Sequence, residues 1–287
     1  MTDVNAGLPD VQHEIKPNYE IPIRQVGVDN IKCHIILESK GGGMNHLLST
    51  VSMSTDLRSD KKGISMSMLL RTLVHYLEVP LKHKLIQQIL EEFKTAVETE
   101  SQDSFIRFEF ELPMLRQAPI SLFRFPQYYK CAFEGRLTKG HFRFFQRVKV
   151  QYASYCPCSA SLCNHLQQNG NNGYPHAQRS FANVLVEVFN DDVIWLEEII
   201  NLIEGAVKTA PVPILRRVDE QEFARVAYEN PMFVEDAIRT ISNALDGEKR
   251  IHDWIVKCTH EESIHTSEAV AINWKGIENG FDGLLFL

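Results

Sequence analysis

The predicted order of secondary structure is the feature of this sequence that most constrains its fold. The order strand, strand, helix, helix, strand, strand appears twice, over residues 21–138 and again over residues 139–287. Strands joined by hairpins rather than by crossover helices pair in antiparallel fashion, and paired helices between them cover one face of the sheet. The sequence therefore predicts an α+β protein made of two modules in one bimodular domain, after an irregular arm over residues 1–20.

The clearest strand pattern lies in the stretch 141–152. Its even-numbered positions are apolar apart from Gln146, and polar side chains dominate its odd-numbered positions, as in a strand with one buried face. Apolar spacings of three and four residues predict the helices. The expected strands are 24–37, 47–57, 105–112, 122–135, 141–152, 180–189, 251–258 and 269–274. The expected helices are 64–77, 81–97, 193–207 (with Asp191 and Asp192 as cap candidates), 219–228 and 233–245.

Composition excludes several classes of protein. A formal net charge of −7 does not attract nucleic acid or an anionic membrane by its overall field. No apolar run reaches the roughly 18 residues of a transmembrane helix, and the polar, acidic N-terminus lacks the pattern of a secretory signal. Six cysteines in 287 residues favour a reduced, cytoplasmic protein over a disulfide scaffold.

Residues 155–180 concentrate side chains that bind transition metals. This segment contains Cys156-Pro157-Cys158, then Cys163, His165 and His176. Thiolates and imidazoles are preferred ligands of late transition metals. From spacing alone, Cys156 and Cys158 are either site residues or two buried, inert cysteines. A four-ligand site made of Cys156, Cys158, Cys163 and His165 is another possibility, although its spacing matches no common zinc module.

The other candidate residues each have an ordinary structural explanation as well. A loop histidine such as His176 is usually a surface residue. Glu220 and Glu235 fit the first turns of two helices, where acids complement the helix dipole. Glu262 and His265 fit a polar connection between the last two strands. Taken one at a time, none of them predicts a site.

Together, the order and separation of these pieces resemble GTP cyclohydrolase I of the prokaryotic type, called type IB. The resemblance covers essentially the whole chain. The pieces most specific in combination are Cys156-Pro157-Cys158-Ser159, Asn230-Pro231-Met232-Phe233-Val234-Glu235-Asp236 and Glu262-Ser263-Ile264-His265. Further matches are Leu8-Pro9-Asp10, Gln25-Val26-Gly27-Val28, Lys62-Gly63-Ile64-Ser65-Met66-Ser67, His176-Ala177-Gln178-Arg179-Ser180 and Asp219-Glu220.

The resemblance implies a fold, an activity and an assembly. The fold is the tunnel fold, with two β-β-α-α-β-β modules. The activity is hydrolytic opening of the guanine ring of GTP with release of formate, giving 7,8-dihydroneopterin triphosphate for folate and pterin biosynthesis. The assembly is a homotetramer with active sites at its interfaces, and neither nucleic acid nor a membrane is expected as a partner.

The resemblance also assigns roles to residues. It implies Cys156, His176 and Glu220 as ligands of a divalent metal, a mixed donor set that suits zinc, manganese or iron(II). Cys158 resembles the thiol that contacts the substrate. Glu235 resembles the carboxylate that holds the guanine edge, with Arg179 as a candidate for the triphosphate. Glu262 and His265 resemble the polar residues that bind the ribose or transfer protons.

Some positions depart from the family pattern. The segment between Cys158 and His176 is longer and is expected to be a loop, which could bring Cys163 or His165 near the metal; we expect both to be bystanders. Ala160 stands where a lysine is expected, and Ser65 and Ser267 stand where histidines are expected. Two alternatives therefore stay open. One is a tunnel-fold deazaguanine nitrile reductase, which would need NADPH, and the other is a non-catalytic relative that binds a purine or a metal.

Overall fold

The computed structural model describes residues 11, 15–97, 101–189 and 194–282. Within them the chain forms eight strands and six helices. The first half contains β1 (Ile23–Glu38), β2 (Met44–Leu57), α2 (Met66–Val74), α3 (His83–Ala96), β3 (Asp103–Gln117) and β4 (Arg124–Thr138). The second half contains β5 (His141–Tyr155), α4 (Pro157–Gln168), β6 (Ala177–Val188), α5 (Leu196–Val207), α6 (Arg217–Glu229), α7 (Val234–Gly247), β7 (Ile251–Glu262) and β8 (Ala269–Trp274).

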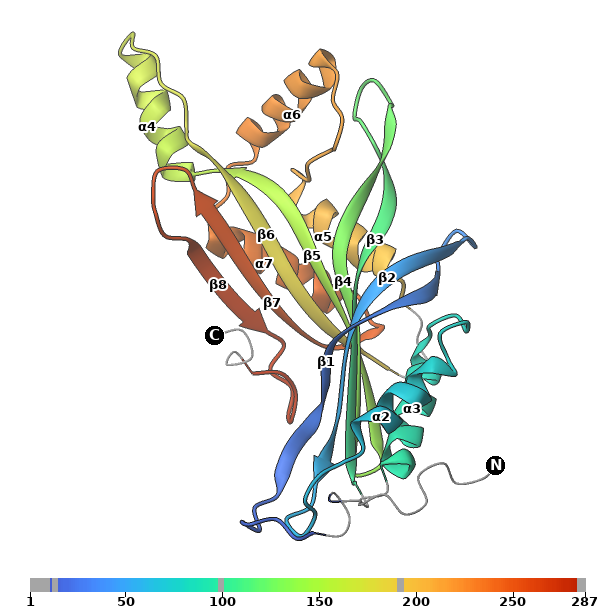
Figure 1. Cartoon of the computed structure of the whole chain (residues 1–287). Helices are drawn as coiled ribbons and strands as arrows, with labels where there is room; N and C mark the ends of the chain where they lie inside the picture. Colours follow the sequence, from blue (N-terminus) through green and yellow to red (C-terminus); the bar gives the residue numbers. More distant parts are fainter. Residues whose placement is uncertain (1–10, 12–14, 98–100, 190–193, 283–287) are drawn as a thin grey trace. The chain divides into compact units, whose positions relative to one another are not determined.

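The strands form one sheet in which they follow one another in chain order, from β1 to β8 (Figure 1). The pairs β1–β2, β2–β3, β6–β7 and β7–β8 are antiparallel. The predicted α+β class with antiparallel pairing is confirmed. None of the helices in the described part of the chain is long and apolar enough to cross a membrane.

Contacts between residues divide the chain into two units. The first unit holds residues 1–110 and 133–144, and the second holds residues 111–132 and 145–287. This division follows contacts, so the predicted boundary between residues 138 and 139 stays a prediction. In the first unit, one face of α3 is buried together with alternate residues of β2 and β3. The buried side chains are Ile86, Ile89, Leu90 and Phe93 on α3, Val51 and Met53 on β2, and Ile106 and Phe108 on β3.

In the second unit, α7 covers the face of β7 that carries its even-numbered residues. The Trp254 indole lies on this face and donates a hydrogen bond of 2.8 Å to Asp246, near the end of α7. The helix contributes a buried stripe at Val234, Ala237, Ile238, Ile241 and Leu245. Full burial of an aliphatic side chain stabilises a fold by roughly 1.5–3 kcal/mol. The opposite face carries a separate cluster of Phe145, Leu185, Ile255 and Phe281.

Two expectations from the sequence need correction. The segment after Cys158, expected as a loop, begins with the helix α4. Pro157 stands in its first turn, where the fixed φ of proline fits and no amide is needed. Only Ala160 and Cys163 are buried on α4, so the helix carries almost no apolar stripe to reveal it. The strands are also longer than expected: β3 reaches Gln117, β5 reaches Tyr155 and β7 reaches Glu262.

The remaining helices lie close to their expected places. Helix α5 begins at Leu196, and the Glu198 carboxylate accepts a hydrogen bond of 3.0 Å from the Trp195 amide at its start. The predicted cap candidates Asp191 and Asp192 lie outside the described residues.

Candidate functional site

Three neighbouring strands of the second unit change from apolar to polar residues at one end. On β7, Trp254, Val256 and Cys258 are followed on the same face by His260 and Glu262. On β6 the same face begins with Gln178 and Ser180 before the apolar run starts. The register pairs Gln178 with Glu262 and Ser180 with His260. Directly paired residues share a face, so these four side chains form one polar patch, named here the strand-end patch.

Strand β5 adds to the strand-end patch from the other side of β6. The hydroxyls of Ser154 and Ser180 lie 3.0 Å apart and are buried. The Tyr152 hydroxyl lies 2.9 Å from Nε2 of His260 and also hydrogen-bonds to the thiol of Cys258. Gln178 Nε2 donates to Nδ1 of His260 over 2.9 Å. Polar groups inside a sheet core must find such partners, and this network provides them for all of these groups except Oε1 of Gln178.

The charge state of His260 follows from its place in this network. Burial lowers the pKa of His260 to about 4, and the negative charge of Glu235 acts in the opposite direction. The imidazole is therefore neutral at pH 7. Because Nδ1 accepts from Gln178, the ring proton stands on Nε2 and is donated to Tyr152.

Cys156 and His176 meet next to the strand-end patch. Cys156 caps the start of α4, and its amide donates to the carbonyl of His176 over 3.5 Å. The His176 amide in turn donates to Ser159 Oγ over 3.3 Å. His176 Nδ1 is buried, and no group in the described part of the chain hydrogen-bonds to it. Cys158 lies in the first turn of α4 and is exposed. The structure thus brings together two of the three metal ligands that the sequence predicts.

Glu235 approaches the strand-end patch from α7. The amide of Met232 donates to the carbonyl of Tyr155, at the end of β5, over 3.0 Å. This bond holds the start of α7 beside β5, and Glu235 stands exposed in the first turn of that helix. The negative charge of Glu235 acts on the pKa of His260, on β7.

Glu262 and His265 lie where β7 turns towards β8. The His265 Nε2 and a Glu262 carboxylate oxygen are 3.5 Å apart, with His265 largely exposed. Arg179 pairs with Glu261, so its side chain leaves the sheet on the face opposite to Gln178. The register therefore places Glu262 beside Gln178, two residues after His176, and directs Arg179 to the other face of the sheet.

Glu220 lies apart from Cys156 and His176. It is exposed in the first turn of α6, and its neighbour Asp219 is fully buried. The Asp219 carboxylate accepts hydrogen bonds from the Ile120 amide (2.9 Å), the Ser121 amide (2.7 Å), the Ser121 hydroxyl (2.6 Å) and the Arg216 amide (2.8 Å). Burial acts to raise the pKa of Asp219, but these hydrogen bonds outweigh it and the pKa is lowered. Asp219 thereby ties the start of α6 to the turn between β3 and β4.

The far end of α6 is the end that contacts β5 and α4. The Tyr228 ring lies 6.5 Å from that of Tyr155, and its hydroxyl donates to Asn164 over 2.8 Å. Glu220 is eight residues earlier, about 12 Å along a helix. Within the described residues, no three His, Cys, Asp or Glu side chains converge closely enough to hold a metal.

The predicted metal therefore fits the chain's residues in part. The enclosed His176 Nδ1, without a partner among the described residues, is the kind of atom that a metal would satisfy, and Cys156 beside it supplies a soft donor. Cys163 is buried on α4, while His165 is exposed and lies 3.4 Å from the Asn169 amide. The alternative set of Cys156, Cys158, Cys163 and His165 does not converge among the described residues.

The sequence reasoning missed the inner part of this site. The sequence assigns no site role to Tyr152, Ser154, Gln178, Ser180 or His260, although Gln178 and Ser180 stand within the matched segment from His176 to Ser180. One signal could have found them: polar residues occupy positions where the two-residue period of β5, β6 and β7 demands apolar ones.

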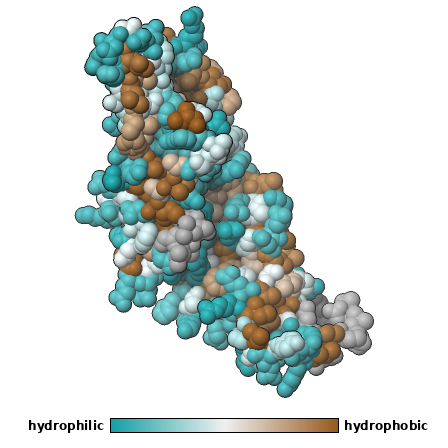
Figure 2. Space-filling model, turned by 90° about the vertical axis from the view of Figure 1, so that its left-hand side faces the viewer, coloured by the Kyte–Doolittle hydropathy of each residue, from teal (hydrophilic) through white to brown (hydrophobic). Residues whose placement is uncertain are grey.

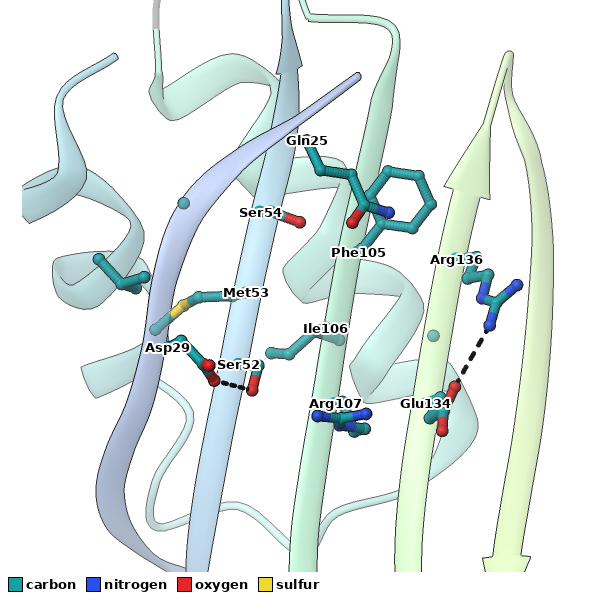
Figure 3. Close-up of a pocket in the computed structure, with 13 residues that line it drawn as sticks. Gln25, Asp29, Ser52, Met53, Ser54, Phe105, Ile106, Arg107, Glu134 and Arg136 are labelled. Carbon is teal, nitrogen blue, oxygen red and sulfur yellow. Dashed lines mark hydrogen bonds and ion pairs between the residues drawn. The ribbon is translucent and has the colours of Figure 1, made fainter. Parts of the chain in front are cut away.

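A cavity of about 480 Å³ lies in the first unit and holds none of the predicted site residues (Figure 3). It lies over β1 to β4, and several of its polar groups pair with one another. Ser52 donates to Asp29, and Arg136 contacts Glu134 at 3.4 Å. Figure 3 shows the Asp29–Ser52 pair across β1 and β2 and the Glu134–Arg136 pair along β4, with Arg107 on β3 between them.

Comparison with known proteins adds an independent finding. The family model of type I GTP cyclohydrolase FolE2 matches residues 8–271. The chain is 34% identical to GTP cyclohydrolase FolE2 of Dinoroseobacter shibae over 283 residues, which cover 96% of this chain and 77% of that protein. It is 33% identical to GTP cyclohydrolase FolE2 of Paracoccus denitrificans, over 94% of this chain and 85% of that protein.

Solved structures show the likeness of fold alone. Uricase from Arthrobacter globiformis superposes with a TM-score of 0.56 at 5% identity, over 92% of this chain and 98% of that one. Urate oxidase from Bacillus sp. TB-90 gives a TM-score of 0.55 at 8% identity, over 88% of this chain and 99% of that one. The family match spans both units, includes every predicted site residue, and agrees with the motifs of the sequence. The chain therefore belongs to the FolE2 family of type I GTP cyclohydrolases.

Proposed function

We propose that this protein is a GTP cyclohydrolase I that opens the guanine ring of GTP, releases formate and forms 7,8-dihydroneopterin triphosphate in folate biosynthesis. The observation that carries the proposal is the family match together with the gathering of its motifs at one end of β5, β6 and β7. Three backbone observations support it: Cys156 is hydrogen-bonded to His176, Glu262 pairs with Gln178 two residues after His176, and Met232, just before the helix of Glu235, is hydrogen-bonded to the end of β5. The family match does not favour the reductase or the non-catalytic alternative.

We propose that Cys156, His176 and Glu220 hold a divalent cation. When bound, zinc, manganese or iron(II) would supply Lewis-acid activation of a water for attack on C8 of the base. Cys156 and His176 are already adjacent, and the unsatisfied Nδ1 supports this role for His176. Glu220 would join them only if the start of α6 moved or if the ligand came from a second copy of the chain.

The chain's own residues would bind the base and move protons. The exposed Glu235 carboxylate can accept two parallel hydrogen bonds, from N1–H and from the 2-amino group of guanine. Glu262 and His265, 3.5 Å apart, can pass a proton to N9 as the C8–N9 bond breaks and take one from the water that then releases C8 as formate. The exposed Cys158 thiol, two residues after Cys156 in the first turn of α4, would contact the same part of the substrate.

The finer fold and the assembly are part of the proposal. The order β1-β2-α2-α3-β3-β4 supports a first tunnel-fold module. The second half would be a module with two added helices, α4 and α6. Strands β1 and β8 end the sheet order, and α4 exposes Leu162 and Leu166. Figure 2 shows hydrophobic side chains reaching the surface in several patches on the face that it draws. Such edges and patches suit a homotetramer, which light scattering after size exclusion would detect.

Metal removal and add-back tests the proposed activity. Stripped protein should have no activity with GTP, and zinc, manganese or iron(II) should restore formate release and a product that fluoresces after oxidation. If no divalent metal restored turnover of GTP, the proposed activity would be wrong. NADPH oxidation with a deazaguanine nitrile, without reaction of GTP, would favour the reductase instead.

A further inference from the structure

A buried glutamine in the strand-end patch has a hydrogen-bond partner for its amide nitrogen but none, among the described residues, for its amide oxygen. Gln178 is 5% exposed, and its Nε2 donates to His260. Its Oε1 is enclosed and accepts no hydrogen bond from any described residue. An enclosed acceptor without a donor destabilises a fold by about 1–3 kcal/mol, and a ligand that supplied the donor to Gln178 would remove this cost.

The contact with His260 fixes which end of the Gln178 amide points towards the imidazole. Nδ1 of His260 accepts, and it can do so only from the NH₂ end of Gln178. His260 is itself held by Tyr152, and Tyr152 by Cys258. The amide oxygen therefore faces away from His260. A glutamine held this way presents an acceptor and not a donor.

The neighbours of Gln178 indicate what would supply the missing donor. Gln178 contacts His260, and the hydrogen bond from Met232 to Tyr155 holds the start of α7, with Glu235, beside the end of β5, close enough for the charge of Glu235 to act on His260. The donor edge of guanine carries three N–H hydrogens, one on N1 and two on the 2-amino group. A single carboxylate accepts two of them in parallel, which leaves the second amino hydrogen without an acceptor.

We propose that Gln178 is a specificity residue whose Oε1 accepts this second hydrogen of the guanine 2-amino group, with His260 as the positioning residue that orients the amide. This inference rests on the proposed function and on Glu235 as the anchor of the base. It assigns the selection of a 2-aminopurine to two acceptors, the Glu235 carboxylate and the Gln178 amide oxygen.

Substrate analogues separate this contact from the rest of the site. ITP lacks the 2-amino group, N2-methyl-GTP lacks only its second hydrogen, and dGTP keeps the whole base and serves as control. In the metal-loaded protein, Gln178→Met should lower kcat/KM for GTP and dGTP about tenfold, mainly through KM, and leave ITP within twofold. A single hydrogen bond within the usual range accounts for a change of this size. Gln178→Ala should also reduce the discrimination against N2-methyl-GTP, because it makes room for the methyl group.

A matched control comes from the same unit. Gln146 is a second buried glutamine whose Nε2 donates to the Ile194 carbonyl over 2.9 Å, and whose Oε1 likewise finds no donor among the described residues. Gln146→Met removes the same chemistry away from the strand-end patch and should leave the GTP-to-ITP ratio unchanged. His260→Leu should lower that ratio about threefold, and His260→Gln, which restores an acceptor for Gln178, should recover it.

The outcomes are distinct. Equal losses for GTP and ITP in Gln178→Met, with a melting temperature like that of Gln146→Met, would overturn the proposal and leave the cyclohydrolase function intact. If the wild-type protein does not turn over GTP, the proposed function fails; calorimetric binding of GTP and ITP to the wild type and to Gln178→Met would then still decide the specificity role. If Gln178→Met does not fold, the His260 pair decides the matter: a ratio unchanged in His260→Leu overturns the proposal.

Discussion

The cavity of the first unit and the strand-end patch of the second unit differ in how their polar groups are satisfied. In the cavity, Asp29 has Ser52 and Glu134 has Arg136 as partners, and the enclosed Arg107 Nε, which makes no hydrogen bond within the described chain, is paired at 3.6 Å with the Glu109 carboxylate. In the second unit, His176 Nδ1 and Gln178 Oε1 are enclosed and find no partner among the described residues. Unsatisfied polar atoms indicate a ligand better than hollow volume does, because leaving them unpaired destabilises the fold. The predictions below set changes in the strand-end region against changes in the first unit.

The largest difference in activity between substitutions in the strand-end region and substitutions in the cavity is expected for the predicted metal ligands. Cys156→Ala and His176→Ala should each lower activity by more than about 100-fold, beyond the usual loss for residues that merely support a metal ligand. Both should lower the bound metal measured by mass spectrometry. Arg107→Ala in the cavity should change activity by less than about twofold. A His176→Ala protein that kept full activity and its bound metal would contradict the role of His176 as a metal ligand.

The next contrast concerns two glutamates. Glu235→Gln replaces a charged double acceptor by an amide, and a charge-assisted pair of this kind contributes about 3 kcal/mol, so kcat/KM for GTP should fall about 100-fold. Glu134→Gln makes the same change in the cavity and should have an effect below about twofold. Steady-state kinetics of both variants, with circular dichroism as a check of folding, would measure the difference.

The pH dependence of stability gives a third contrast. His260 has a pKa of about 4 in the folded chain against 6.5 as its ordinary value. The unfolded chain therefore binds a proton first, and the stability that His260 contributes is present above pH 6.5 and lost as the pH falls towards 4. The loss amounts to roughly 3 kcal/mol at most. Urea unfolding of His260→Gln should lack this part of the pH slope, whereas His34→Gln, exposed in the first unit, should keep it.

The smallest effect is expected for the cysteine and histidine on α4. Cys163→Ala and His165→Ala should leave metal content unchanged and activity within about twofold, since neither converges with Cys156 and His176 in the described chain. A loss of bound metal in either variant would support the four-ligand alternative.

Periodicity predicted most of the fold because β3 and β5 alternate and α3, α5 and α7 carry apolar stripes. It predicted that β7 ends at Cys258, because the polar residues His260 and Glu262 are typical of the end of a strand. In the structure both residues still pair with β6. Periodicity missed α4 because a helix exposed on most sides has no stripe to detect. The family motifs named the outer site residues, whereas Gln178 acquires its meaning only from the pairing of two strands distant in sequence.

The carboxylate of Asp219 also limits how readily the start of α6 can move. Its bonds to the amides of Ile120, Ser121 and Arg216 hold backbone groups that lie outside the strands and helices. Such amides usually exchange their hydrogens rapidly with solvent, and here they should exchange slowly and together, because one opening event frees all three. Hydrogen exchange at these positions would therefore report how often the start of α6, with Glu220, comes free.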